Sequence, residues 1–352
     1  MMLEGKRVVV TGGTGSLGKV LVRRLLSGEV GLPRKIVVFS RDEAKQHQMR
    51  VEYQHRIAAT DEIIYRNFEQ LLEFQIGDVR DYHTVASALR GADIVLNAAA
   101  TKQVPTCEYF PYQAVMTNVL GPENIVRAIR ELEPSVETVV AISTDKACKP
   151  VNVMGMTKAL QERIFIRANL DCSRTRFICV RYGNVLASRG SVIPLFLQQI
   201  QSGGPVTITS QDMTRFLLSL DTAVDTIFAA MQSAHRGETY VPCVPACRVT
   251  DIARVMIGGR DIPITVTGVR PGEKLHEILV SEEEAPRTFL RGKYYVIQPI
   301  LPELRDAEVI PTPLNREYSS ASDLMSEAEV RELLELNRLL TPGALDEEEL
   351  LR

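Results

Sequence analysis

The side chains best suited to acid–base chemistry stand at the end of one apolar run. Residues Thr138–Ser143 form a run typical of a buried parallel strand, and Thr144, Asp145 and Lys146 follow it directly. In open parallel sheets, ligands bind beyond the carboxyl ends of the strands. The order therefore predicts that a hydroxyl, a carboxyl and an amine face a reaction site. The alternative is a charged turn that only caps the next helix.

Two further residues lie on the helix predicted over 152–169. Met154 and Lys158 are four positions apart, so their side chains share one face of that helix. Methionine transfers no proton, whereas lysine donates hydrogen bonds and exchanges one. The spacing alone leaves Lys158 open between a site residue and an ordinary exposed lysine.

A glycine-rich turn between a strand and a helix predicts a phosphate-binding site. Glycines stand at 12, 15 and 18, after the apolar run Arg7–Thr11 and within the start of a helical pattern over 17–26. The first permits a tight turn, the second lets the backbone approach a pyrophosphate, and the third lets helix and strand pack closely. The helix N-terminus adds free N–H groups and a positive dipole end. We expect a dinucleotide to bind at Gly12, Thr14, Gly15, Ser16, Leu17 and Gly18.

The end of the second strand indicates which dinucleotide binds. It reads Phe39-Ser40-Arg41-Asp42. An acidic residue at this point suits the ribose 2′-hydroxyl of NAD, whereas an arginine suits the 2′-phosphate of NADP. Ser40 and Arg41 therefore favour NADP, and Asp42 stands one residue too late for the NAD role. After the third strand, Asp78 and Val79 are expected to border the adenine, although an acidic turn residue would look the same.

The pattern of elements predicts an α/β fold, a doubly wound parallel sheet of Rossmann type with a smaller irregular α/β lobe. Short apolar runs alternate with helical patterns in the first half, and prolines interrupt the second. We expect residues 1–187 to form mainly the dinucleotide-binding domain, 188–300 mainly a substrate lobe interleaved with the sheet, and 301–352 a C-terminal extension. Strands are expected at Arg7–Thr11, Lys35–Phe39, Leu72–Gly77, Ile94–Ala98, Thr138–Ser143 and Phe177–Tyr182, and helices at 42–58, 112–132 and 152–169.

Composition and charge argue against several function classes. The 352 residues carry a formal net charge of -3, which does not suit a nucleic-acid surface. No apolar run approaches the roughly 20 residues of a membrane span, and no signal-peptide pattern precedes the first strand. The six cysteines have no paired CxxC spacing. We therefore expect reduced thiols, a cytoplasmic protein and no metal site.

Several segments spread over roughly residues 5–300 extend these patterns. Together with the glycine turn and the helix that carries Lys158, they resemble the extended short-chain dehydrogenase superfamily. Within it, the chain closely resembles the bacterial UDP-N-acetylglucosamine 4,6-dehydratases of capsule and flagellin-sugar synthesis. Met154 departs from the superfamily, which usually has an acid–base tyrosine there, although some members of this branch also carry methionine. The segments are Val38–Glu43, Ser143–Ala147, Arg181–Val185, Ser188–Pro194, Met213–Phe216 and Arg270–Lys274.

The resemblance implies a nucleotide-sugar 4,6-dehydratase that uses NADP. Hydride leaves the sugar C4 for NADP+, water is lost across C5 and C6, and hydride returns to C6. We hypothesise that Lys146 removes the C5 proton, for which its pKa must fall below the usual value of about 10.4. Burial, the nicotinamide charge and Lys158 are expected to lower it. Asp145 then protonates the departing C6 hydroxyl, Thr144 belongs to the same group, and Lys158 binds the nicotinamide ribose.

The resemblance also implies where the substrate, UDP-N-acetylglucosamine, binds. A sugar diphosphate needs cationic side chains that hold it in a bidentate manner, and Arg215 and Arg270 are expected in loops that do so. Either arginine could instead be a surface ion-pair partner. The other expected substrate residues are Lys102, Asn184, Ser191, Pro194 and Glu273, and Ala98, Ala99 and Tyr182 are expected to border the cofactor.

Three rival functions stay open at this point. A UDP-N-acetylhexosamine 4-epimerase would return the hydride to C4, and a related dehydratase would release a 5,6-unsaturated sugar. An inactive NADP-binding sensor or scaffold is the rival from another class, and Met154 favours it. Relatives are commonly multimeric, so a homo-oligomer is expected. A capping box of Ser326 and Glu329 opens a terminal helix, whose apolar stripe predicts packing within the chain or, alternatively, a subunit contact.

Overall fold

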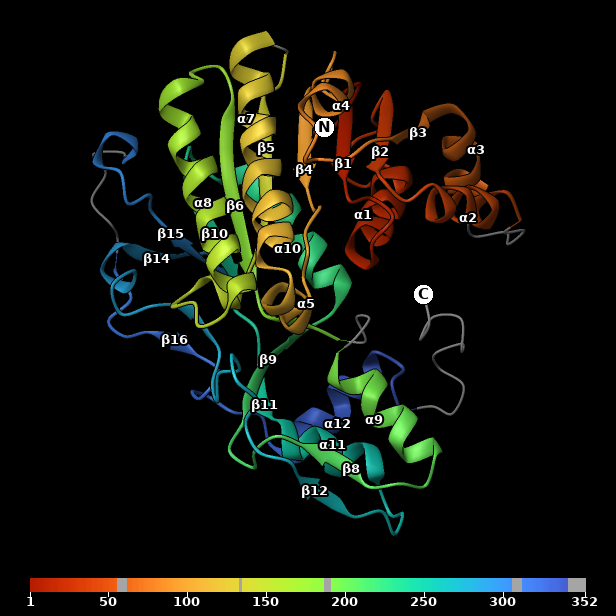
Figure 1. Ribbon diagram of the computed structural model, residues 1–352, viewed down its shortest axis with the longest axis vertical. Coiled ribbons are helices and arrows are strands. Elements are labelled where there is room, and N and C mark those ends of the chain that lie inside the picture. Colours follow the sequence, from red (N-terminus) through yellow and green to blue (C-terminus); the bar gives the residue numbers. More distant parts are fainter. Residues whose placement is uncertain (56–61, 133–134, 187–190, 306–311, 341–352) are drawn as a thin grey trace.

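A nine-stranded sheet forms the centre of the computed structural model, which describes residues 1–55, 62–132, 135–186, 191–305 and 312–340 (Figure 1). All neighbouring strands from β10 to β3 pair in parallel, and β15 and β14 extend the sheet in antiparallel fashion. The predicted α/β class with a doubly wound parallel sheet is therefore confirmed. The strand order is β14 (Thr288–Arg291), β15 (Tyr294–Ile297), β10 (Thr239–Pro242), β6 (Arg176–Tyr182), β5 (Thr138–Thr144), β4 (Ile94–Asn97), β1 (Arg7–Thr11), β2 (Lys35–Ser40) and β3 (Leu72–Ile76).

The central strands are apolar without interruption because both faces of the sheet are covered. Val8 and Val10 of β1 point into one core, and Val9 between them points into the other. This alternation is the period of a strand, and burial on both sides removes the polar positions that a half-exposed strand would show. Helices α1 (Ser16–Ser27) and α10 (Leu220–Ser233) pack into the first core, and α4 (Tyr82–Ala88), α7 (Gly121–Leu132) and α8 (Val153–Asp171) pack into the second.

The helices differ from expectation in two places. The helix predicted over 112–132 is divided into α6 (Pro111–Val115), a wider π-type turn at Met116–Leu120, and α7. Pro122 has no backbone N–H to donate, which is a common cause of such a break. The helix predicted over 42–58 is α2 (Glu43–His55), and its remainder lies outside the described residues. Periodicity did not reveal α3 (Glu62–Leu71), α4 or α5 (Val104–Tyr109).

A smaller lobe with its own core lies below the sheet in the view of Figure 1. The boundary expected at residues 187 and 188 lies outside the described residues. The predicted capping box opens α12, where Val330 and Leu334 are fully buried in the core of this lobe. The terminal helix is thus packed within the chain, as expected. The lobe contains α9 (Val192–Gln201), α11 (Val249–Ile257), α12 (Glu327–Leu336), β8 (Val206–Ile208) and β12 (Ile264–Val266).

Short strands join the lobe to the main sheet. Strand β9 (Thr214–Leu218) pairs with β7 (Asn184–Val185) on one side and β11 (Ala246–Arg248) on the other. Strand β13 (Ile278–Val280) pairs with β16 (Tyr318–Ser319). Within the described residues, no helix has the length and apolar character needed to cross a membrane.

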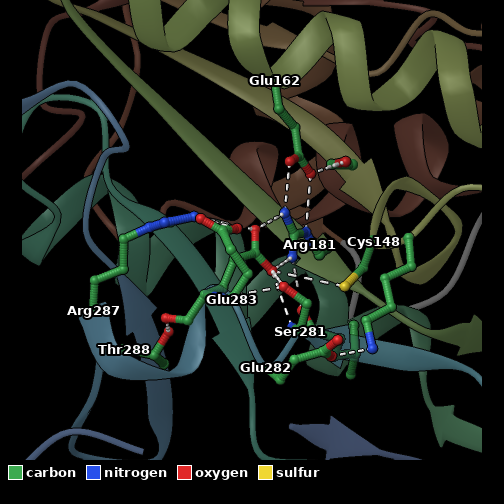
Figure 2. Close-up of polar contacts among 12 residues, drawn as sticks. Cys148, Glu162, Arg181, Ser281, Glu282, Glu283, Arg287 and Thr288 are labelled. Carbon is green, nitrogen blue, oxygen red and sulfur yellow. Dashed lines mark hydrogen bonds and ion pairs between the residues drawn. The ribbon is translucent and has the colours of Figure 1, made fainter.

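A buried ion-pair network ties the second half of the chain to the sheet (Figure 2). The guanidinium of Arg181 on β6 donates to both oxygens of Glu162 on α8 and to both oxygens of Glu284, which follows β13. Ser143 Oγ at the end of β5 donates to Glu162 as well. Burial would raise the pKa of Glu284, but the charge and hydrogen bonds of Arg181 lower it to about 2. The network therefore joins β5, β6, α8 and the segment after β13 in one cluster.

We expect Glu284→Gln to lower the free energy of unfolding by about 3–5 kcal/mol, because it leaves the buried Arg181 with one carboxylate fewer. Since folding depresses the pKa of Glu284 from 4.5 to about 2, its stabilisation is complete above pH 4.5 and is lost as the pH falls towards 2. The variant should therefore lose less stability than the wild type across that window, as measured by chemical denaturation. Glu283→Gln at the neighbouring exposed position is the control, with a change within about 0.5 kcal/mol. An equal loss in both variants would contradict the role of the network.

Candidate active site

A cleft of about 1610 Å³ opens at the carboxyl ends of the parallel strands, with walls from the sheet and from the smaller lobe. It lies where the strand order reverses, since β1 has β2 on one side and β4 on the other. Such a switch point is where open α/β sheets bind ligands. Every residue predicted to bind cofactor or substrate lines this cleft, and so do Thr144, Lys146 and Met154. Asp145 is the exception, because it lies behind this wall.

The glycine turn forms a cradle that leaves no room for side chains. Gly12 has φ of +67°, and a Cβ there would lie 2.8 Å from the backbone of Ala99. A Cβ on Gly18 would lie 2.5 Å from the carbonyl oxygen of Gly12. Gly15 caps α1 without any side-chain hydrogen bond, so the first N–H groups of the helix stay available to an anion. The cradle therefore fits the pyrophosphate of a dinucleotide.

Beside the cradle, the end of β2 presents hydroxyls and cations. Thr14 Oγ1 lies 3.0 Å from Ser40 Oγ. Arg41 is largely exposed, with its guanidinium 3.8 Å from Asp78. Hydrogen bonds from Lys45 lower the pKa of Asp42, whose carboxylate pairs with the Lys45 ammonium at 2.7 Å. Asp42 is thus engaged with α2 and is not free to hold a ribose.

Lys45 also lines this end of the cleft, and sequence reasoning missed it. Its position four residues after Arg41, at the start of the predicted helix, could have indicated that Lys45 lies near Arg41. Two cations rather than one therefore stand where a 2′-phosphate would bind.

The Thr144–Lys146 turn places a buried carboxylate behind two wall residues. Asp145 is fully buried, and Thr144 Oγ1 donates to its Oδ1 at 2.9 Å. Lys146 Nζ donates to the same oxygen at 3.0 Å. The second oxygen, Oδ2, is buried and has no hydrogen-bond partner among the described residues. Asp145 can therefore exchange a proton with the cleft only through Thr144 or Lys146.

The expectation that the pKa of Lys146 falls is wrong for this structure. Burial lowers it, but the carboxylates of Asp145 and Glu277 outweigh burial and raise the pKa above its ordinary value. Glu277 Oε1 lies 3.3 Å from Lys146 Nζ. Sequence reasoning missed Glu277, which stands three residues after the last recognised motif residue, Lys274. Lys146 is therefore an ammonium in the ground state.

Lys158 shows the lowered pKa that was expected of Lys146. Burial lowers the pKa of Lys158 to about 8, although Glu162 opposes the shift. Its Nζ donates to the carbonyl oxygen of Ile142 at 2.5 Å and to Gln161 Oε1 at 2.8 Å. The lysine is buried and directed at the end of β5, which excludes the alternative of an exposed helix lysine.

Met154 fills the position of the missing tyrosine with an apolar side chain. It is 7% exposed and packs against Cys107 and Ala114, while still lining the cleft. Tyr182 carries a phenol that also lines the cleft, and it ends β6 beside Thr144 of β5. Burial raises the pKa of Tyr182.

The two arginines expected in loops lie in different settings. Arg215 lies on strand β9, not in a loop, and its guanidinium donates to the carbonyl oxygens of Thr214, Lys274 and Leu275. Arg270 is exposed in the loop before β13, as expected. Asn152 Nδ2 at the start of α8 donates to the carbonyl oxygen of Gly272, which ties this loop to the helix of Met154 and Lys158.

Several buried polar atoms of the cleft wall have no hydrogen-bond partner among the described residues. Buried polar groups are almost always paired, so such atoms indicate a ligand that pairs them. Residues Ser188, Arg189 and Gly190 of the recognised motif lie outside the described residues. The unpaired atoms are Asn184 Oδ1, Ser191 Oγ, Glu273 Oε2 and Glu277 Oε2.

Comparison with known proteins gives a family and a fold. The family model described as "Polysaccharide biosynthesis protein" matches residues 8–299. A UDP-glucose 4-epimerase of Rickettsia typhi is 42% identical over 301 residues, which are 84% of each chain. Pen from Bacillus thuringiensis is 33% identical with a TM-score of 0.85, over 97% of this chain and 100% of that one. DesIV, a dTDP-glucose 4,6-dehydratase of Streptomyces venezuelae solved with NAD and TYD, shares the fold. It is 21% identical with a TM-score of 0.63, over 76% of this chain and 86% of that one.

We expect Gly18→Ala to lower the free energy of unfolding by about 1–3 kcal/mol, because its Cβ has no space beside the Gly12 carbonyl oxygen. Thermal unfolding of the unliganded protein measures the effect without reference to any activity. The control is Gly204→Ala, where the new Cβ meets no atom within 4 Å. If Gly18→Ala unfolds at the wild-type temperature, the close packing of helix and turn is not needed.

Proposed function

The chain belongs to the polysaccharide biosynthesis protein family, which has the extended short-chain dehydrogenase fold. From this premise we propose that it is an NADP-dependent UDP-N-acetylglucosamine 4,6-dehydratase. The observation that carries the proposal is the Thr144–Lys146 turn, which holds a carboxylate and an amine in hydrogen-bond contact beside the glycine cradle. The product is a UDP-4-keto-6-deoxy-hexosamine for polysaccharide or glycan synthesis.

Elimination of water needs a base at C5 and an acid at C6. A ketone at C4 acidifies the C5 proton, which no side chain removes otherwise at neutral pH. The cofactor supplies the hydride acceptor for C4 and returns the hydride to C6. The protein must therefore supply the two proton transfers, hold the sugar and exclude water.

The ion pair of Asp145 and Lys146 provides the base for C5 and the acid for C6 when one proton moves between the two side chains. Transfer of that proton over 3.0 Å, from Nζ to Oδ1, leaves a neutral amine and a carboxylic acid. The amine takes the C5 proton. The acid releases its own proton to the C6 oxygen by way of the Thr144 hydroxyl, which lies 2.9 Å from Oδ1 and lines the cleft. Both side chains then carry their original charges.

The remaining protons also balance. The Lys146 ammonium protonates C5 when hydride reaches C6, and the site then takes up one proton. That proton balances the one released by the C4 hydroxyl during oxidation. Met154 cannot carry it, so this proton is released to solvent during the oxidation and taken up from solvent at the end.

The cofactor and substrate ends of the cleft support the same proposal. Arg41 and Lys45 suit the 2′-phosphate of NADP, and Asp42 is engaged elsewhere. We assign Lys158, which lines the cleft, to the nicotinamide ribose. Arg270 and the unpaired oxygen of Glu273 suit the diphosphate and the nucleoside of the substrate.

A UDP-hexose 4-epimerase is the second candidate, because the Rickettsia relative carries that name. It would use the same cleft and the same oxidation at C4. It needs no acid for a C6 hydroxyl and no base for C5, so the Asp145–Lys146 pair would serve only the C4 hydroxyl proton. The deciding experiment is therefore the fate of C5 and C6.

We expect the purified protein to convert UDP-N-acetylglucosamine, without added reductant, to a product lighter by one water. In heavy water the product should carry one solvent deuterium at C5, as measured by mass spectrometry. Asp145→Asn should lower turnover at least about 100-fold, because the amide cannot carry the proton. Asp171→Asn, at the exposed end of α8, is the matched control with wild-type turnover. An unchanged mass with a shift to the C4 epimer would favour the epimerase, and no change would contradict both functions for this sugar nucleotide.

We expect Arg41→Ala to weaken NADP binding about tenfold or more and to leave NAD binding nearly unchanged. The reason is that a hydrogen bond to a charged phosphate contributes about 1.5–3 kcal/mol, and NAD lacks that group. Titration calorimetry with both cofactors measures the difference. Arg23→Ala on α1 removes an arginine that does not line the cleft, and should change neither affinity. Tighter binding of NAD than of NADP by the wild type would overturn the cofactor assignment.

A further inference from the structure

Lys146 is held by two carboxylates, and only one of them belongs to its own turn. Asp145 Oδ1 lies 3.0 Å from Nζ, and Glu277 Oε1 lies 3.3 Å from it. Glu277 comes from the segment before β13, more than a hundred residues away in sequence. Its side chain is 3% exposed and lines the cleft. Glu277 is therefore a buried acid at the place where the proposed proton transfers occur.

Three cations surround Glu277, and Lys146 is the nearest of them. Arg215 Nε lies 3.9 Å from Oε1 and Lys274 Nζ lies 4.0 Å from Oε2, both too far for a hydrogen bond. Arg215 already donates to a carbonyl oxygen at 2.7 Å, and Lys274 donates to the carbonyl oxygen of Cys148 at 2.5 Å. Lys146 Nζ is thus the closest cation to Glu277. The main contact that this carboxylate makes is with the lysine of the catalytic turn.

The backbone of Glu277 is fixed by the C-terminal extension. Its N–H donates to Ser320 Oγ at 2.9 Å, and its carbonyl oxygen accepts from the N–H of Ser320 at 2.8 Å. Ser320 is fully buried, and its hydroxyl also lies 2.7 Å from Thr214 Oγ1. The pairing of β13 with β16 continues this contact. A segment beyond the family match at 299 therefore places the carboxylate against Lys146.

We propose that Glu277 is a positioning residue of the proton-transfer site, which holds Nζ of Lys146 at the cleft wall together with Asp145. The role deepens the proposed dehydratase function and rests on it. One hydrogen bond to Asp145 and one ion pair with Glu277 then hold Nζ at the wall. The second oxygen of Glu277, Oε2, is buried and has no hydrogen-bond partner among the described residues.

The charges around Lys146 show what the loss of Glu277 would do. The groups that face it are Asp145 from its own turn, Glu277 and Lys274 from the segment before β13, and Arg215 from β9. Asp145 and Glu277 favour the ammonium, and the two other cations disfavour it. Without the Glu277 charge, the repulsion of Lys146 by Arg215 and Lys274 is less compensated, and the pKa of Lys146 falls. Nζ would also lose one of the two contacts that position it.

The test compares Glu277→Gln, which removes the charge at constant shape, with Glu277→Asp, which keeps the charge on a shorter side chain. Acetic anhydride acylates only neutral amines, so the labelling of Lys146 against pH, read by peptide mass spectrometry, reports its protonation without any turnover. We expect about tenfold faster labelling of Lys146 at neutral pH in Glu277→Gln, the factor given by one pKa unit. Glu277→Asp should stay close to the wild type. Glu238→Gln removes an equally buried carboxylate, paired with Arg291 at the far edge of the sheet, and should leave the labelling unchanged.

The kinetic part uses the dehydration of UDP-N-acetylglucosamine. Glu277→Gln should lower kcat about 10- to 100-fold through misplacement of Nζ, with KM changed less than about threefold. Glu277→Asp should recover part of kcat. The rising limb of the kcat profile should move to lower pH in Glu277→Gln, which a merely structural role would not produce.

The outcomes separate the two proposals. Wild-type labelling of Lys146 in Glu277→Gln would overturn the role of Glu277, whatever the activity. A wild-type protein that forms no product, with labelling shifted as expected, would overturn the dehydratase function and keep the contact. If Glu277→Gln does not fold, Glu277→Asp decides: its kcat should stay below that of the wild type, and a wild-type kcat would overturn the positioning role.

Discussion

The structure depends on one electrostatic constraint, which is that cations at the carboxyl end of the sheet are buried and must meet carboxylates. An unpaired buried charge costs several kcal/mol, so Arg181 on β6 and Lys146 after β5 require acidic partners. The first half of the chain supplies Glu162 and Asp145. The other two, Glu277 and Glu284, come from the segment around β13. The second half of the chain thus supplies a second carboxylate to each of these two cations.

The same constraint shapes the cleft. Because the segment around β13 must reach β5 and β6, the loop before it crosses the carboxyl ends of the strands and closes one side of the site. Asn152 and Lys274 fix this loop to the start of α8 and to the Cys148 carbonyl oxygen. The glycine cradle forms the other side, where the chain after β1 packs against the chain after β4. The nucleotide cradle and the acid–base groups thus line one cavity with Glu277, which comes from the second half of the chain.

Local patterns predicted the parts of this arrangement that local physics determines. Strands β1, β2 and β5 were found because burial on both faces makes them apolar throughout, and the cradle because only glycine fits there. Predictions failed where residues distant in sequence determine the local structure or the pKa. Arg215 was expected in a loop, but it lies on a strand that exists only through pairing with β7 and β11. The pKa of Lys146 was expected to fall, but Glu277 approaches it from a segment whose position no local pattern indicates.

The contrast between the two lysines of the cleft explains how the site can work without the usual tyrosine. Lys158 has a carbonyl and an amide as partners, so burial prevails and its pKa falls to about 8. Such an amine donates hydrogen bonds to ribose hydroxyls in either protonation state. Lys146 has two carboxylates, so its proton is held but has an acceptor within hydrogen-bond distance. In the proposed elimination, proton transfer within this ion pair needs no tyrosine, because donor and acceptor are already in contact, and Met154 packs against Cys107 and Ala114.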